Sequence, residues 1–189
     1  EIEAGHIDVS HWVPWMVLTS QWRKWRIDAR ELDRGPRRAD LVGMFGELYH
    51  NRVLELAADI PHAGRLEDPE GSSLKVSRVC GSTVNVDVRL DEDGKLAAIA
   101  VDPKACALGQ AATSILAREA IGKTVEEISA AREMLRAMLK GEGEAPAQGA
   151  AFWELRHLEP VRDYPPRHAS TMLAFEAAVE AMETALAAR

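Results

Sequence analysis

Apolar and polar residues alternate regularly along one segment near the centre of the chain, from residue 84 to residue 90. This period of two is typical of a half-buried strand, which has one face on the core and one face in water. The segment 91–94 that follows is acidic and ends in glycine, which favours a hairpin turn, and residues 96–101 supply the return strand. Residues 74–79 predict a further strand that ends at Cys80. The pattern therefore predicts a small three-stranded antiparallel sheet.

Helical periods of three and four residues occur on both sides of these strands. Residues 41–58 predict one helix before the sheet, ended by a loop that contains proline and glycine. Further helices are expected from about Cys106, from 124 to about 139, over 152–158, and after the prolines 165–166. Thr124 and Glu127 have the spacing of a capping box. Strands followed by helices are typical of an α+β domain, so we expect the sheet to pack against several helices.

Residues 1–40 differ from the rest, because they hold four of the five tryptophans. These tryptophans and one leucine fall at steps of three and four, which predicts one face of a helix: Trp12, Trp15, Leu18, Trp22 and Trp25. We interpret this segment as a Trp-rich helical extension ahead of a domain that covers residues 41–189. It could dock on a partner or a membrane surface, pack on the domain as an extra helix, or have no fold of its own.

Composition narrows the classes of partner. The chain has 189 residues, 47% of them apolar and 28% charged, which suits one domain with a core that needs no metal or disulfide. The net charge of −7 argues against nucleic acid as a partner, since phosphate binding needs a positive field. No apolar run approaches the roughly 18–20 residues of a membrane span. The acidic N-terminus does not resemble a signal peptide, so we expect a cytoplasmic location.

The candidate chemistry rests on two cysteines and one histidine. Cys80 is expected at the end of a strand and Cys106 at the start of a helix, where the helix dipole favours the thiolate that binds metals or attacks electrophiles. The alternative is that both are small buried apolar residues. His168 could bind a metal or act as a base, or it could be an ordinary surface or capping residue. The chain has no Gly-rich phosphate loop, GxSxG or HExxH motif.

The order of the short motifs resembles the NifU/IscU-type family of iron–sulfur cluster assembly scaffolds, which includes a zinc-binding, SufU-like branch. The resemblance covers roughly residues 44–187 and rests on four segments: Leu48-Tyr49 with the loop 60–64, Val79-Cys80-Gly81-Ser82, Ala105-Cys106-Ala107, and Arg167-His168-Ala169-Ser170 before Leu173-Ala174-Phe175. It implies an α+β fold in which a small three-stranded sheet packs against several helices. It also implies a carrier without ordinary turnover, supplied with sulfur by a cysteine desulfurase and delivering iron–sulfur clusters to acceptor proteins.

The resemblance implies that Cys80 and Cys106 are ligands, with Cys106 as the candidate persulfide acceptor. Two positions depart from the family pattern: Ser82 replaces an aspartate that makes the cluster labile, and Ser170 replaces the third cysteine. One protomer then offers two thiolates, whereas 2Fe–2S and 4Fe–4S clusters usually take four. Three outcomes stay open. A homodimer could share one cluster, His168 could complete a Cys-Cys-His site for iron or zinc in a sulfur acceptor, or the fold could serve partner binding without metal.

Overall fold

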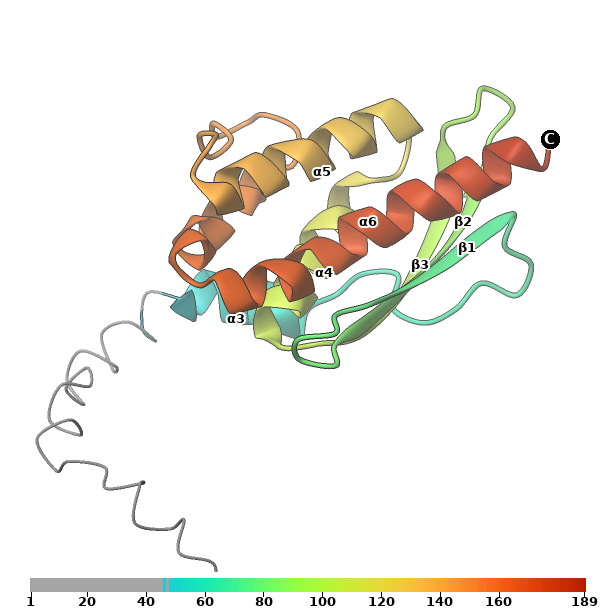
Figure 1. Ribbon diagram of the computed structural model, residues 1–189. Coiled ribbons are helices and arrows are strands. Elements are labelled where there is room, and N and C mark those ends of the chain that lie inside the picture. Colours follow the sequence, from blue (N-terminus) through green and yellow to red (C-terminus); the bar gives the residue numbers. More distant parts are fainter. Residues whose placement is uncertain (1–45, 47) are drawn as a thin grey trace, which may run out of the picture. The chain divides into compact units, whose positions relative to one another are not determined.

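The computed structural model describes residue 46 and residues 48–189, and its elements form a three-stranded antiparallel sheet with helices packed around it (Figure 1). In chain order they are α3 (Asn51–Ala58), β1 (Gly71–Val76), β2 (Thr83–Leu90), β3 (Leu96–Lys104), α4 (Ala107–Glu119), α5 (Val125–Lys140), the 3-10 helix η2 (Trp153–Asp163) and α6 (Pro165–Ala187). The strand order is β1-β2-β3. The expected meander and α+β class are therefore confirmed. The Trp-rich extension lies outside the described residues.

The long helix α6 lies along the inner face of the sheet, against β1 and β2, while α4 contacts both β3 and α6 (Figure 1). The alternating valines of β2 at positions 84, 86 and 88 are fully buried on this face. Gly71 of β1 lets α6 approach closely, because a Cβ at this position would collide with the backbone carbonyl of Ala181 in α6. Helix α5 packs on α6, so the core lies between the sheet and these helices.

The outer face of β2 corrects the expectation of a half-buried strand, because its polar residues are buried too. Asn85 is 8% exposed and Asp87 is 0% exposed. The loop between α3 and β1 covers this face: Ala63 bridges to Val101, and Arg65 forms an ion pair with Asp87. Sequence alternation alone could not show that a loop covers the second face. The burial of Asp87 depends on its hydrogen bonds.

The buried carboxylate of Asp87 accepts hydrogen bonds from four residues. Its carboxylate takes one from Arg65 Nε at 2.6 Å and one from Ser72 Oγ at 2.5 Å. The side-chain amide of Asn85 and the backbone N–H of Leu66 donate at 3.0 and 3.2 Å. Burial raises the pKa of Asp87, but these donors outweigh it and hold the pKa at about 2.

Several element boundaries differ from the expected ones. The strand expected at residues 74–79 is β1, which begins at Gly71 and ends at Val76, so Cys80 lies in a turn instead of at a strand end. Of the helix expected over residues 41–58, the described residues 46 and 48 are helical, and α3 begins at Asn51 after His50, which has extended backbone. The expected helix 152–158 is a longer 3-10 segment, and the two prolines are the first residues of α6 instead of preceding it. The capping box of Thr124 and Glu127 is present.

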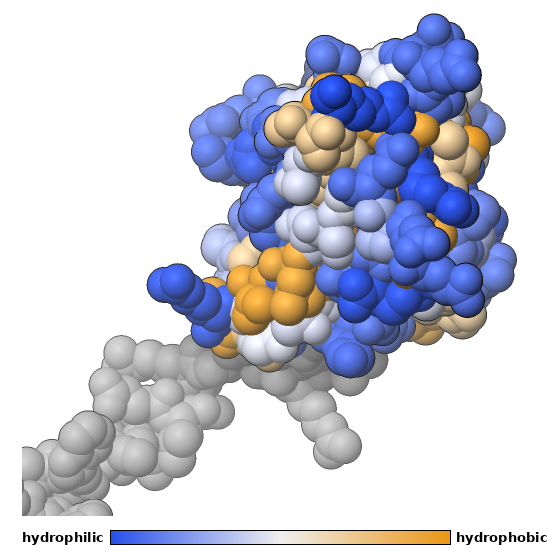
Figure 2. All heavy atoms as spheres, turned by 90° about the vertical axis from the view of Figure 1, so that its right-hand side faces the viewer, coloured by the Kyte–Doolittle hydropathy of each residue, from blue (hydrophilic) through white to orange (hydrophobic). Residues whose placement is uncertain are grey.

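The surface is mostly polar. Figure 2 shows one face on which hydrophilic residues predominate and apolar side chains gather in a small area. The large apolar residues that are exposed within the described part of the chain are Leu54, Leu74, Val76, Val79, Ile121 and Leu186. In the same part of the chain, no helix has the length and apolar character needed to span a membrane.

Asp87→Asn should destabilise the fold at neutral pH. The pKa of Asp87 is about 2 in the native state and about 4 in the unfolded state. The ionised carboxylate therefore stabilises the native state fully when the pH is above about 4, and this stabilisation is lost as the pH falls through about 2. We expect the variant to lose about 2 kcal/mol of unfolding free energy at pH 7 and to show a shallower decline in acid. Urea unfolding from pH 7 to 3 measures both. Asp93→Asn in the exposed β2–β3 turn is the control, and an equal loss there would contradict this account.

Candidate functional site

Cys80 lies in a tight turn between β1 and β2, with an exposed thiol. The turn is closed by two backbone hydrogen bonds, from Ser77 N to Ser82 O and from Gly81 N to Ser77 O, both 2.8 Å. Gly81 has a φ of 73°, which glycine adopts without strain. The sequence before and after the cysteine therefore shapes a loop that presents its sulfur to solvent.

Two serine hydroxyls face the Cys80 sulfur. Sγ lies 3.3 Å from Oγ of Ser77 and 3.1 Å from Oγ of Ser82. Hydrogen bonding with Ser77 and then with Ser82 favours the thiolate, and the positive charge of Arg167 adds to this effect. Together they lower the pKa of Cys80 to about 7. A large fraction of this thiol is thus ionised near neutral pH, the form that binds iron or attacks a sulfur electrophile.

Cys106 is the N-cap residue of α4, as the sequence predicts, and is partly buried. Its Sγ lies 3.7 Å from Oγ of Ser170, which is 0% exposed. Ser170 also donates a hydrogen bond to the carbonyl of Arg167 at 3.0 Å. Helices α4 and α6 pack closely here. A Cβ on Gly109 of α4 would lie only 3.0 Å from the carbonyl oxygen of Ser170 in α6.

Residues in the first turns of α6 act on both cysteines. The charge of Arg167 acts on Cys80, while its carbonyl accepts the hydrogen bond from Ser170, the neighbour of Cys106. Segments that are far apart in the chain therefore meet at the start of α6. Both serines that stand in family ligand positions, Ser82 and Ser170, contact a cysteine sulfur.

The imidazole of His168 faces backbone carbonyls of η2. Its Nε2 lies 3.0 Å from the carbonyl oxygen of Val161 and 3.1 Å from that of Arg162, both in η2. The described residues contain no group of three or more Cys, His, Asp or Glu side chains that could hold a metal ion. The arrangement thus does not preassemble a Cys-Cys-His site, and the three-ligand sets typical of zinc are not seen in this part of the chain.

Sequence reasoning missed two contributors to the site, Ser77 and Arg167. It also did not predict the lowered pKa of Cys80, which lies in a turn. The sequence pattern predicts one strand over residues 74–79, which conceals the place of Ser77 in the turn. The spacing of Ser77, Cys80 and Ser82 is typical of a tight turn with local side-chain hydrogen bonds and could have indicated this arrangement.

Comparisons with known proteins identify relatives of this chain. The chain matches the family model described as the NifU-like N terminal domain over residues 48–181. It is 31% identical over 142 residues to the iron–sulfur cluster assembly scaffold protein IscU of Streptococcus pyogenes serotype M1, covering 75% of this chain and 87% of that protein.

Solved structures show the same fold. The N-terminal part of a nitrogen-fixing NifU-like protein from Brucella abortus superimposes with a TM-score of 0.72 at 40% identity, covering 76% of this chain and 98% of that one. FiSufU from Fervidobacterium islandicum AW-1, a candidate scaffold protein for the SUF system, gives a TM-score of 0.64 at 20% identity, covering 72% and 98%. At that identity the likeness concerns the fold alone.

Ser77→Ala should raise the pKa of Cys80, because it removes the hydroxyl that contributes most to stabilising the thiolate. In a Cys106→Ala background, where Cys80 is the remaining thiol, we expect iodoacetamide alkylation to reach half its maximal rate near pH 7. Ser77→Ala should move this midpoint toward the usual thiol value of about 8.5. Ser129→Ala on α5 is the control. An unchanged midpoint in Ser77→Ala would show that this hydroxyl does not tune the thiol.

Proposed function

Because the chain belongs to the NifU-like N-terminal domain family of iron–sulfur cluster assembly scaffolds, we propose that it accepts sulfur and iron on Cys80 and Cys106 and passes the assembled cluster to acceptor proteins. The observation that carries this proposal is that residues at the start of α6 act on both cysteines, Arg167 through its charge on Cys80 and Ser170 through its contact with Cys106, and that Cys80 is exposed with a pKa of about 7. The cluster is the cargo of such a protein. Its sulfur would come from a cysteine desulfurase.

Cys80 is better suited than Cys106 to receive the first sulfur. Its thiol is exposed and about half ionised near neutral pH, whereas Cys106 is partly buried beside Ser170. In the transfer, the Cys80 thiolate attacks the terminal sulfur of a donor cysteine persulfide. A new S–S bond forms at Cys80, the S–S bond of the donor breaks, and the donor cysteine leaves as a thiolate. An external two-electron donor must then reduce the transferred sulfur to sulfide, which frees the Cys80 thiolate as a cluster ligand, and Cys106 acts as the second ligand.

The hydroxyls of Ser82 and Ser170 act as hydrogen-bond partners of sulfur, not as metal ligands. A neutral hydroxyl is a poor substitute for thiolate toward iron. With two thiolates per chain and four needed by the common clusters, two copies sharing one cluster satisfy the ligand count. Ser82 also supplies no carboxylate to compete for iron, so we expect slower cluster release than from a scaffold with aspartate at that position.

Partner binding without metal is the alternative. It is favoured by the lack of a three-ligand group in the described residues and by the full burial of Ser170, which fills the third ligand position with a hydroxyl. A zinc-dependent sulfur acceptor would need a further ligand in addition to the two thiolates. Metal analysis separates these functions.

Anaerobic reconstitution with Fe²⁺ and sulfide, followed by desalting, tests the proposal through the iron and acid-labile sulfide retained. We expect both to be retained by the wild-type protein and to fall to background in Cys80→Ala and in Cys106→Ala. His168→Ala is the matched control and should retain both, since its imidazole faces backbone carbonyls. Retention by either cysteine variant would contradict the two-thiolate site. Zinc without sulfide in the wild type would favour the sulfur-acceptor alternative.

A further inference from the structure

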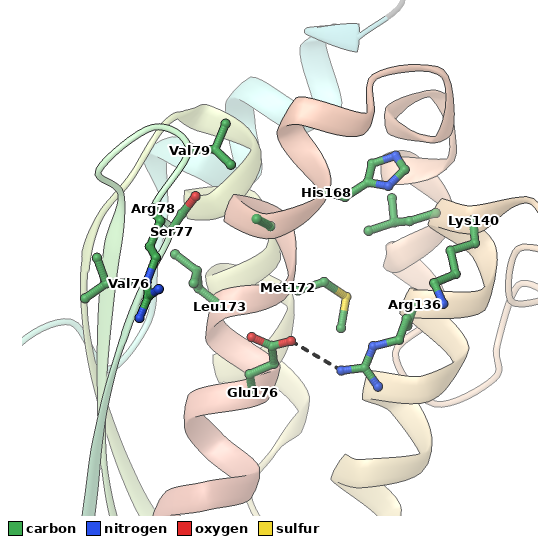
Figure 3. Close-up of a pocket in the computed structure, with 12 residues that line it drawn as sticks. Val76, Ser77, Arg78, Val79, Arg136, Lys140, His168, Met172, Leu173 and Glu176 are labelled. Carbon is green, nitrogen blue, oxygen red and sulfur yellow. Dashed lines mark hydrogen bonds and ion pairs between the residues drawn. The ribbon is translucent and has the colours of Figure 1, made fainter.

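A groove of about 500 Å³ borders the thiol site, between the β1–β2 turn, α5 and α6 (Figure 3). Its apolar wall comes from all three elements and comprises Val76, Val79, Leu139, Met172 and Leu173. Val76 is 53% exposed and Val79 is 69% exposed, which is unusual for large aliphatic side chains in the middle of a folded surface. Val76 and Val79 therefore present apolar surface to solvent at the edge of the groove, while Leu139, Met172 and Leu173 behind them are buried.

Two basic side chains flank the wall. Arg78 comes from the turn and Lys140 is the last residue of α5, so they approach the groove from opposite sides (Figure 3). Both are exposed, and neither forms an ion pair with another described residue. Arg136, by contrast, is held by Glu133 and Glu176. These two cations make the edge of the groove locally positive, although the net charge of the chain is −7.

We propose that this groove docks an acidic peptide segment of a partner protein, which places an apolar side chain against Val76 and Val79 and carboxylates near Arg78 and Lys140. Charge complementarity selects this occupant, because apolar contact supplies affinity while the two cations select acidic flanks. A second copy meeting the groove with its own groove would place the same cations against one another. This repulsion disfavours a symmetric pair of copies as the occupant and favours a partner segment with acidic flanks.

Docking here would bring the partner next to the reactive sulfur. Val79 immediately precedes Cys80, and Ala169, which also lines the groove, immediately precedes Ser170. The inference goes beyond the proposed function, since binding at the groove requires neither thiol nor cluster. Its failure and the failure of cluster binding are separate results.

Fluorescence anisotropy with the full chain tests the docking site. The probe is a fluorescein-labelled peptide with two central leucines flanked on each side by two glutamates, and a second peptide replaces the glutamates with lysines. We expect the acidic peptide to bind and the lysine peptide not to bind. The double variant Arg78→Glu/Lys140→Glu should weaken binding about tenfold or more, because two favourable charge contacts become repulsive. Raising the salt concentration should also weaken binding.

Lys95→Glu is the matched control, because this exposed lysine lies in the β2–β3 turn outside the groove. It should bind the acidic peptide like the wild type, as should Cys80→Ala. Circular dichroism checks that each variant is folded, and amide shifts in an NMR titration should map to the groove. The proposal is overturned by equal binding of the two peptides, by equal weakening in Lys95→Glu, by shifts that map elsewhere, or by no binding at about 1 mM peptide. Self-association that the groove variant abolishes would assign the groove to a second copy and also overturn it.

Discussion

The close packing of α6 against both the sheet and α4 is the constraint on which the site depends. Gly71 lets α6 approach β1 at one end, and Gly109 lets it approach α4 beside Ser170 at the other. A side chain at either position would push the helix away, and close-packed interiors accommodate such changes poorly. Because Arg167 and Ser170 lie in the first turns of α6, this packing brings them to the two cysteines. Close backbone contacts in the interior of the fold therefore determine where Arg167 and Ser170 lie relative to the two cysteines.

The two cysteine sulfurs are surrounded by hydroxyl groups and, at Cys80, by the charge of an arginine as well. The local turn places two hydroxyl groups within hydrogen-bonding distance of the Cys80 sulfur, and the charge of Arg167 from α6 adds to their effect. Cys106 has a different environment, partly buried at a helix start next to a buried hydroxyl. One chain thus holds an accessible, readily ionised sulfur and a more protected one. This asymmetry suits a protein that receives sulfur at one position and retains it with the help of another.

Much of this fold follows from sequence patterns, and the failures have physical causes. The valine alternation of β2, the capping box at Thr124 and the helix start after Cys106 are local signals, and the structure contains all three. The burial of Asp87 was not predictable from alternation, since it depends on a loop that folds over the sheet from outside. Ser77 and Arg167 were missed because their roles arise from a turn and from a contact between distant segments. The side chain of His168 had equally plausible directions in sequence, and packing against η2 decided between them.

The central claim is that each chain contributes two thiolates, Cys80 and Cys106, to a cluster held between two copies. Native mass spectrometry of the anaerobically reconstituted protein tests this most directly, because it reports chain number, iron and sulfide in a single mass. The account predicts a species of two chains with one cluster, and apo protein without it. A cluster carried by a single chain would contradict the shared site, and a mass that never gains iron or sulfide would contradict the assignment of these thiols as a cluster site.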